Sequence, residues 1–254
     1  MELPPVGLGT MGIETPSTIE TALEVGYRHL DTAQIYDNEG IVGDGLAASD
    51  LDREDVIVAT KVWADSLDPA AVSATTTRSL NRLGLDRIDL LYVHRPIETY
   101  DAETTLSAFD DLYDAGTIGA VGLSNFTVDQ LREARQHLAA PIVAHQVECH
   151  PLCWSPGLLA DAREHDYQLV AYSPLAGGHV RETDAVVDIA EDHETTPEAV
   201  SIAWLLTKPN VVTIPKASSR RHLEANLDAQ QPRLTDAECR RIDEVDRTLE
   251  LYPE

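Results

Sequence analysis

The chain has 254 residues and a mass of 27.8 kDa, and its 44 acidic residues outnumber its 19 lysines and arginines, which gives a formal net charge of −25. This charge repels polyanions, so we expect no nucleic-acid partner. No stretch of about 18 apolar residues occurs, and the first residues do not resemble a signal peptide, so we expect neither a membrane span nor secretion. Three cysteines are an odd set for a disulfide framework, and the sequence predicts a cytoplasmic protein.

Short β-branched or leucine-rich runs alternate with amphipathic stretches along the whole chain. We expect eight strands, at Val6–Gly9, Tyr27–Asp31, Val56–Lys61, Ile88–His94, Ala120–Ser124, Ile142–Gln146, Gln168–Tyr172 and Val211–Ile214. Between them, a capping residue followed by proline predicts helix starts at Thr15-Pro16, Asp68-Pro69, Ser155-Pro156 and Thr196-Pro197. The alternation predicts an α/β fold, a single (β/α)8 TIM barrel over residues 1–254 with trimmed loops and a short C-terminal tail.

An open dinucleotide-binding sheet is the main alternative fold. The segment Gly7–Gly12 matches the pattern G-x-G-x-x-G, and Asp31 follows about 20 residues later, where a ribose-binding acid would stand. In that fold, however, the glycines open a helix directly. Here the helix start at Thr15-Pro16 lies beyond the glycines, which favours the barrel.

Polar side chains stand at the ends of three neighbouring predicted strands. Asp31, Lys61 and His94 close the second, third and fourth strands, and Tyr36 follows in the loop after Asp31. The chemistry of such barrels takes place at the carboxyl ends of the strands, so these side chains converge on one rim. Asp31, Tyr36 and His94 each also have an ordinary structural interpretation as a cap or a packing residue. Lys61 is the exception, because a lysine in an apolar run requires a partner, and Asp31 is the natural one.

Seven motifs, in the right order, resemble those of the aldo-keto reductases, and in particular small microbial members similar to 2,5-didehydrogluconate and methylglyoxal reductases. The motifs are Gly26–Ala33 with Tyr36 and Asn38-Glu39, Thr60–Trp63, Leu91–His94, Gly122–Phe126, His145–Pro151, Ala171–Leu175 and Ile214–Lys216. The resemblance implies reduction of aldehydes or ketones by hydride transfer from NAD(P)H, with Asp31, Tyr36, Lys61 and His94 as catalytic residues.

Physical chemistry supports these roles. Tyr36 would protonate the carbonyl oxygen, and a nearby ammonium favours loss of its proton. Lys61 would supply that ammonium and Asp31 would keep it charged. His94 would donate a hydrogen bond to the carbonyl oxygen.

The resemblance also implies the other site residues. Ser124, Asn125 and Gln146 would bind the carboxamide of the cofactor, Tyr172 would stack on its nicotinamide, and Ser173–Leu175 would approach its pyrophosphate. The full predicted cofactor set is Gly9, Thr10, Ser124, Asn125, Gln146, Tyr172, Ser173, Leu175, Ile214, Lys216, Ser218, Ser219, His222 and Asn226. Met11 and Trp63, and more weakly Trp154, are expected to wall the substrate pocket, and the short tail should leave its mouth open.

The segment 208–222 holds Lys208, Lys216, Arg220 and Arg221 without an acidic residue, and we expect this basic island to meet a phosphate. His222 stands where the family often has an arginine for the 2′-phosphate. We therefore favour NADP(H), with Lys216, Ser218 and Ser219 as contacts, and keep NAD(H) as an alternative.

The sequence offers two alternative functions. A metal-dependent barrel hydrolase or isomerase could use His145, Glu148, Cys149, His150 and Cys153, although their spacing matches no common zinc pattern. A nucleotide-sensing barrel without turnover is the non-enzymatic alternative, although nothing in the sequence suggests a docking extension and all four catalytic candidates are present. We expect a small carbonyl substrate, no bound metal, a monomer, and an enzyme adapted to salt because of its charge.

Overall fold

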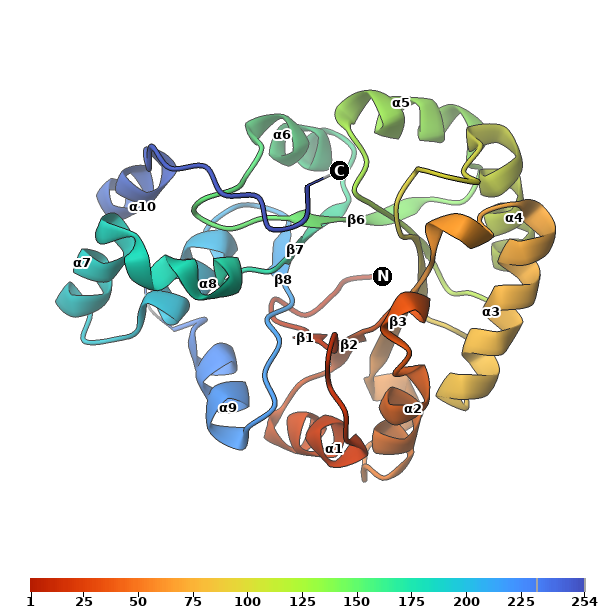
Figure 1. Ribbon diagram of the computed structural model, residues 1–254, viewed down its shortest axis with the longest axis horizontal. Helices are drawn as coiled ribbons and strands as arrows, with labels where there is room; N and C mark the ends of the chain where they lie inside the picture. The colour runs from red at the N-terminus through yellow and green to blue at the C-terminus, as the bar shows by residue number, and fades with distance from the viewer. Residues whose placement is uncertain (232, 254) are drawn as a thin grey trace.

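Eight parallel strands form one sheet in the chain order β1 to β8 (Figure 1). The computed structural model describes residues 1–231 and 233–253. The strands are β1 Leu8–Gly9, β2 His29–Asp31, β3 Ile57–Val62, β4 Leu90–Val93, β5 Val121–Ser124, β6 Ile142–Glu148, β7 Gln168–Tyr172 and β8 Val211–Thr213. A parallel bridge between Val6 and Thr213 closes the sheet. The predicted (β/α)8 barrel is confirmed, and every predicted strand is present with ends shifted by at most about two residues.

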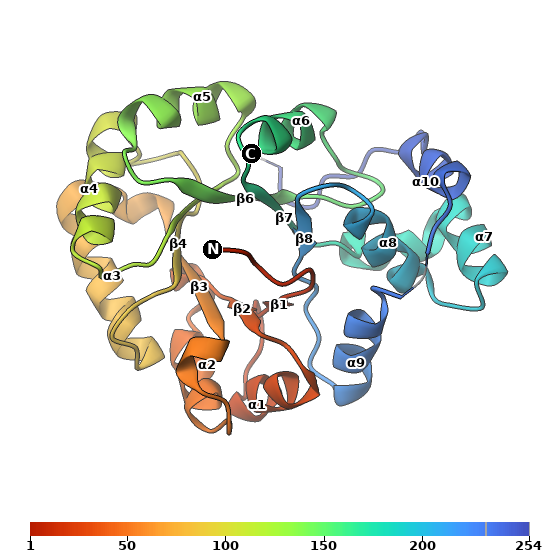
Figure 2. The same cartoon turned by 180° about the vertical axis from the view of Figure 1, so that it is seen from behind.

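The helices surround the barrel (Figures 1 and 2). The α-helices are α1 Pro16–Val25, α2 Glu39–Ala47, α3 Pro69–Leu83, α4 Ala102–Asp114, α5 Val128–His137, α6 Pro156–Glu164, α7 Asp184–Asp192, α8 Pro197–Leu206, α9 Arg220–Asp228 and α10 Asp236–Asp243. Short 3-10 helices occur at η1 Gln34–Tyr36, η2 Arg53–Asp55, η3 Ala64–Ser66 and η4 Ala176–Glu182. Among the described residues, no helix combines the length and the apolar character that crossing a membrane requires.

All four helix starts predicted from a capping residue and a proline are confirmed. The side chains of Asp68, Ser155 and Thr196 each accept a hydrogen bond from the backbone N–H three residues later. Thr15 differs, because its hydroxyl lies 3.0 Å from the hydroxyl of Thr18. Proline with its fixed φ is therefore the feature that all four starts share.

The first two glycines of the G-x-G-x-x-G pattern allow close packing within the barrel, whereas Gly12, with φ of 71°, has open space around it. A Cβ on Gly7 would stand 2.4 Å from Nδ1 of His29, and one on Gly9 would stand 2.6 Å from the Ile214 carbonyl oxygen. Helix α1 begins at Pro16, beyond these glycines. Gly7 and Gly9 thus make room for the His29 side chain and the Ile214 backbone, and the closed sheet shows that the open-sheet alternative is wrong.

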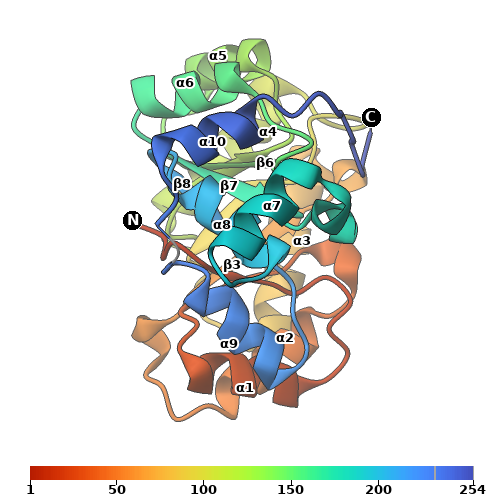
Figure 3. The ribbon, with the colours of Figure 1, turned by 90° about the vertical axis from the view of Figure 1, so that its left-hand side faces the viewer.

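Two apolar regions hold the barrel together. The larger cluster fills the space between strands and helices, and a smaller one inside the barrel includes Leu3, Leu90, Tyr92 and Val170. The N-terminal segment covers the amino end of the strands, where the Leu3 N–H donates to Oε1 of Gln168 at 2.6 Å (Figure 2). The two termini lie on opposite sides of the barrel (Figure 3). With the amino end covered, the carboxyl end is the side on which a site can open.

Candidate active site

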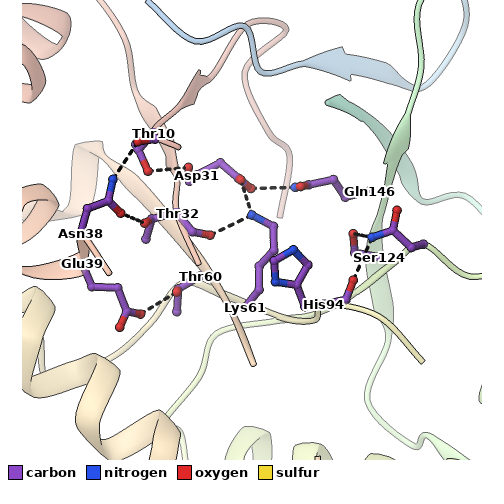
Figure 4. A network of polar contacts seen from close by, with 11 residues as sticks. Thr10, Asp31, Thr32, Asn38, Glu39, Thr60, Lys61, His94, Ser124 and Gln146 are labelled. Atoms are coloured by element: carbon purple, nitrogen blue, oxygen red, sulfur yellow. Dashed lines mark hydrogen bonds and ion pairs between the residues drawn. The ribbon is translucent and has the colours of Figure 1, made fainter. Parts of the chain in front are cut away.

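A buried ion pair joins the carboxyl ends of two neighbouring strands. Lys61 on β3 donates from Nζ to Oδ1 of Asp31 on β2 at 2.5 Å and to the Thr32 carbonyl oxygen at 2.8 Å (Figure 4). Gln146 on β6 donates from Nε2 to Oδ2 of Asp31 at 2.7 Å. Burial alone would lower the pKa of Lys61, but the charge of Asp31 and hydrogen bonds hold it above its ordinary value. The lysine is therefore a cation, with the partner that the sequence predicts.

Tyr36 faces this cation from η1, the turn that follows β2. Nζ of Lys61 lies 5.2 Å from the centroid of the Tyr36 ring. Burial raises the pKa of Tyr36 above its ordinary value, while the charge of Lys61 lowers it and opposes that rise. The ammonium lowers the pKa of Tyr36 as expected, but burial raises it by more, so the phenol keeps its proton at neutral pH.

His94 completes the group from the loop after β4. Its ring centroid lies 6.0 Å from that of Tyr36 and 4.9 Å from that of Trp63, edge-on in both cases. Burial, followed by the charges of Lys61 and Arg95, lowers the pKa of His94 to about 2. Its Nδ1 is buried and has no hydrogen-bond partner among the described residues. A neutral imidazole carries one N–H, so His94 can donate a hydrogen bond to a ligand without carrying charge.

These side chains border one cavity of about 600 Å³ at the carboxyl end of the barrel. The catalytic candidates in its lining are Asp31, Tyr36 and His94, while Lys61 lies buried behind them. The predicted cofactor residues in its lining are Gly9, Thr10, Ser124, Asn125, Gln146, Tyr172, Ser173, Ile214 and Lys216. Of the predicted pocket residues, Met11 and Trp63 line it. The structure therefore brings most of the predicted site together.

Hydrogen bonds through the side chain of Asn125 connect the residues on one side of the cavity. Asn125 donates from Nδ2 to the His94 carbonyl oxygen at 2.9 Å and to Oγ of Ser124 at 3.1 Å. The Tyr172 hydroxyl donates to Oδ1 of Asn125 at 3.0 Å. Asn125 has φ of 61°, a left-handed conformation that asparagine tolerates better than most residues. The loop after β5 therefore holds His94 from behind and places an aromatic ring beside the amides.

In the described part of the chain, the cavity lining does not include Leu175, Ser218, Ser219, His222, Asn226 or Trp154. Ser218 is nevertheless adjacent, because Lys216 donates from Nζ to its Oγ at 3.2 Å. Ser219 caps α9 by accepting a hydrogen bond from the His222 N–H.

The prediction for Trp154 is corrected, because this ring packs edge-on against Trp204 with centroids 5.9 Å apart. Lys208 lies between the two rings, with Nζ 4.6 Å and 4.1 Å from their centroids, and pairs with Asp243 at 2.9 Å. Trp154 is thus part of the packing around a cation of the chain itself.

This arrangement also corrects the basic island. Lys208 forms an ion pair with Asp243, and Arg220 forms ion pairs with Glu24 and Glu224, so both cations have counter-charges within the protein. Lys216 is exposed and lines the cavity. Neither Arg220 nor Arg221 is in the cavity lining, so the island offers Lys216, with its neighbour Ser218, to a ligand phosphate in the cavity.

The C-terminal tail reaches the cavity, which the sequence analysis missed. Glu148 at the end of β6 accepts hydrogen bonds from the backbone N–H groups of Leu251 and Tyr252, at 2.8 Å and 3.2 Å. Arg95 donates to the Tyr252 carbonyl oxygen at 3.2 Å, and the Tyr252 ring lies 5.9 Å from that of Tyr172. Tyr252 lines the cavity, so the expectation of a mouth left open by a short tail is wrong at this corner.

The residues proposed as metal ligands are engaged differently. Nε2 of His145 accepts a hydrogen bond from the Phe126 N–H, and Nε2 of His150 is hydrogen-bonded to Oε1 of Glu148 at 2.8 Å. Burial raises the pKa of Cys149 to about 12. Within residues 1–231 and 233–253, no three His, Cys, Asp or Glu side chains gather as a metal site. The cluster therefore gives the hydrolase alternative no support.

Comparison with known proteins agrees with this geometry. The chain matches the aldo/keto reductase family over residues 5–247. It is 34% identical over 244 residues to methylglyoxal reductase DkgB of Escherichia coli O157:H7, covering 94% of this chain and 91% of that protein. Glyoxal reductase of Bacillus subtilis (strain 168) is 33% identical over 257 residues, covering 100% and 92%. The crystal structure of MGS-M4, an aldo-keto reductase from a Medee basin deep-sea metagenome library, has a TM-score of 0.94 at 32% identity, covering 100% and 95%.

The chain belongs to the aldo/keto reductase family, as its motifs indicate, and it is an oxidoreductase that acts on carbonyl groups.

Proposed function

We propose that this protein reduces aldehydes or ketones to alcohols with NAD(P)H, and that Tyr36 is the proton donor. One observation carries the proposal: Lys61 is held as a cation by Asp31 at 2.5 Å and lies 5.2 Å from the Tyr36 ring, at the wall of the cavity. A buried cation in this place stabilises the phenolate that remains after Tyr36 has given up its proton.

The residues around the cavity fit a nicotinamide dinucleotide. The amides of Asn125 and Gln146 and the hydroxyl of Ser124 offer donors and acceptors, and Tyr172 offers an aromatic face. At the other end of the lining, Lys216 offers an exposed cation for a phosphate. When bound, the dinucleotide would supply the hydride for the carbonyl carbon.

The roles of the chain's own residues follow from their protonation. Tyr36 keeps its proton until the carbonyl oxygen gains charge, and then passes the proton from Oη to that oxygen. His94 is neutral and donates its ring N–H to the same oxygen, which aligns the carbonyl and stabilises the developing charge. Asp31 accepts the hydrogen bond of Lys61 and keeps the ammonium charged and oriented.

The substrate class follows from the walls of the cavity and from the relatives. Apolar side chains line the mouth, among them Met11, Ile35, Trp63 and Tyr252. The relatives named above are reductases of methylglyoxal and glyoxal. We propose small aldehydes and α-ketoaldehydes as substrates, with NADP(H) favoured through Lys216 and Ser218 and NAD(H) as an alternative.

The test is the loss of absorbance at 340 nm when the purified protein is mixed with NADPH or NADH and a panel of carbonyls that includes methylglyoxal and glyoxal. We expect turnover with the small aldehydes and a higher kcat/KM for NADPH. A clear preference for NADH would overturn the cofactor assignment. Tight dinucleotide binding without turnover of any carbonyl would favour the nucleotide-sensing alternative.

A further inference from the structure

The turn that carries Tyr36 is not anchored by its own burial. In η1, Gln34 and Tyr36 are only partly buried and Ile35 is 47% exposed, although the surroundings of the Tyr36 phenol are dense enough to raise its pKa. Apolar packing fixes most side chains in a barrel, but here it holds the flanking segments more than the turn. The place of the phenol relative to Lys61 must therefore depend on polar contacts on either side of the turn.

The contact before Tyr36 is made by Gln34. This side chain donates from Nε2 to Oγ of Ser79 on α3 at 3.1 Å, and its Oε1 accepts a long hydrogen bond of 3.4 Å from the Trp63 N–H. The contact to Trp63 is long and both contacts are only partly buried, so they are the weaker side of the attachment.

Two residues that follow Tyr36 make contacts. Asn38 donates from Nδ2 to the Thr10 carbonyl oxygen at 2.7 Å and accepts at Oδ1 from the Thr32 hydroxyl at 2.9 Å, which ties the turn to β2.

Glu39, the first residue of α2, has a fully buried side chain and ties the turn to other elements. One carboxylate oxygen, Oε1, accepts a hydrogen bond from the Thr60 hydroxyl at 2.7 Å (Figure 4). The other, Oε2, accepts from Nη1 of Arg82 on α3 at 2.9 Å. Thr60 precedes Lys61 on β3, so a single carboxylate ties the segment of Tyr36 to the strand of Lys61.

We propose that Glu39 is a positioning residue of the reduction, and that its bonds to Thr60 and Arg82 set the distance between the Tyr36 phenol and the Lys61 ammonium. The inference rests on the proposed role of Tyr36 as proton donor. The Glu39 carboxylate is strongly bound to its partners, because losing them would leave a buried charge without compensation for its lost hydration. Glu39 therefore resists the displacement that the exposed turn would otherwise allow.

The consequence appears in the titration of Tyr36. The charged groups that act on its phenol are Lys61, whose charge lowers its pKa, and Asp31 and Tyr252, whose charges raise it. His94 also faces the Tyr36 ring, but it is neutral over the pH range of the test. If Tyr36 moves away from Lys61, the lowering influence weakens and the pKa of Tyr36 rises further. A reduction that needs protonated Tyr36 then keeps its activity to higher pH, although the misplaced phenol makes each turnover slower.

The test uses Glu39→Gln, which keeps an acceptor for Thr60 but sets an amide N–H₂ against Arg82. We expect kcat for methylglyoxal reduction to fall about tenfold to a hundredfold, with KM for NADPH changed less than about twofold. The alkaline limb of the kcat profile should move to higher pH. Glu39→Asp should recover part of both effects, because the carboxylate is kept.

Asp161→Asn is the matched control. Asp161 is a buried carboxylate on α6 that accepts hydrogen bonds from Arg135 at 2.9 and 3.0 Å and from the Tyr167 hydroxyl at 2.7 Å, outside the cavity lining. This variant loses the same kind of charge, so its melting temperature should fall while kcat and the pH profile stay at the wild-type values.

If Glu39→Gln lowers the melting temperature but keeps the wild-type kcat and alkaline limb, Glu39 is only structural and the inference is wrong. If Glu39→Gln does not fold, Thr60→Val decides, because it removes only the contact to the strand of Lys61 and should shift kcat and the limb in the same directions; wild-type behaviour of this variant would overturn the inference. Failure of the wild-type protein to reduce any carbonyl is a separate result that removes the proposed function itself.

Discussion

At the scale of single residues, the site is built around one buried lysine. Lys61 is completely buried, and such a group stays protonated only if a counter-charge compensates for its lost hydration. Asp31 provides that charge and Gln146 fixes the second oxygen of the same carboxylate. This pair keeps Lys61 charged, whereas burial is the main reason that the pKa of Tyr36 is raised and the pKa of His94 is lowered, so that Tyr36 is protonated and His94 neutral.

Asp31→Asn tests this dependence. The folded-state pKa of Lys61 is raised, so the stabilisation from its charge is complete below the ordinary lysine pKa and is lost only as the pH rises through the raised value. Without the carboxylate, burial dominates, and Lys61 should lose its proton at lower pH. We expect the alkaline limb of the kcat profile to move to lower pH, opposite to the shift expected for Glu39→Gln. We also expect a stability loss of about 3–5 kcal/mol from the unpaired buried cation.

The measurements for this variant are kcat against pH and unfolding in urea at neutral pH. An alkaline limb that stays in place while stability falls would show that Asp31 does not control the charge of Lys61.

At the scale of elements, what the sequence predicts well is what depends on neighbours along the chain. The strands and the proline helix starts are visible because local alternation and capping chemistry determine them. The convergence of Asp31, Lys61 and His94 is predictable for a similar reason, since consecutive parallel strands end at the same rim.

The elements that were misjudged depend on distant contacts. Trp154 lies in the loop after β6, and nothing local shows that Trp204, fifty residues further along, will cover it. Tyr252 is held through its backbone N–H and carbonyl groups, by Glu148 and Arg95, and backbone groups leave no mark in a sequence. Both errors concern which surface a loop or tail packs on, and only tertiary structure determines that.

The segment between α8 and α9 offers a matched pair of lysines. Lys216 lines the cavity, whereas Lys208 lies between two tryptophans and pairs with Asp243. We expect Lys216→Met to raise KM for NADPH about tenfold without changing the melting temperature. Lys208→Met should lower stability by about 1–2 kcal/mol and leave KM for NADPH unchanged, because its cation acts only within the protein.

Steady-state kinetics and thermal unfolding of both variants decide the matter. A raised KM in the Lys208 variant, or an unchanged one in the Lys216 variant, would contradict this assignment of the two cations.

At the scale of the whole molecule, the charge remains the most unusual property. Nineteen basic residues cannot neutralise 44 carboxyl groups, so many acidic side chains repel one another. The screening length falls to about 3 Å near 1 M salt, which removes most of this repulsion between exposed groups. We therefore predict that melting temperature and activity both rise with KCl towards about 1 M.

The rise in melting temperature and activity with KCl should be larger at pH 8 than at pH 5.5. The sequence pI is near 4.5, so the net negative charge is smaller at pH 5.5. A melting temperature and activity that are greatest in dilute buffer and fall steadily as KCl rises would refute adaptation to salt. The same samples give the oligomeric state by light scattering, for which we predict a monomer.

The central claim is that Tyr36 delivers the proton to the carbonyl oxygen, and Tyr36→Phe tests it most directly. The variant removes a single hydroxyl and keeps the ring of a partly buried side chain, so the fold and the affinity for NADPH, followed by fluorescence titration, should be unchanged. We predict that kcat for NADPH-dependent reduction of methylglyoxal falls by about 10²- to 10⁴-fold, the usual contribution of a general acid. Undiminished turnover in Tyr36→Phe would contradict the account.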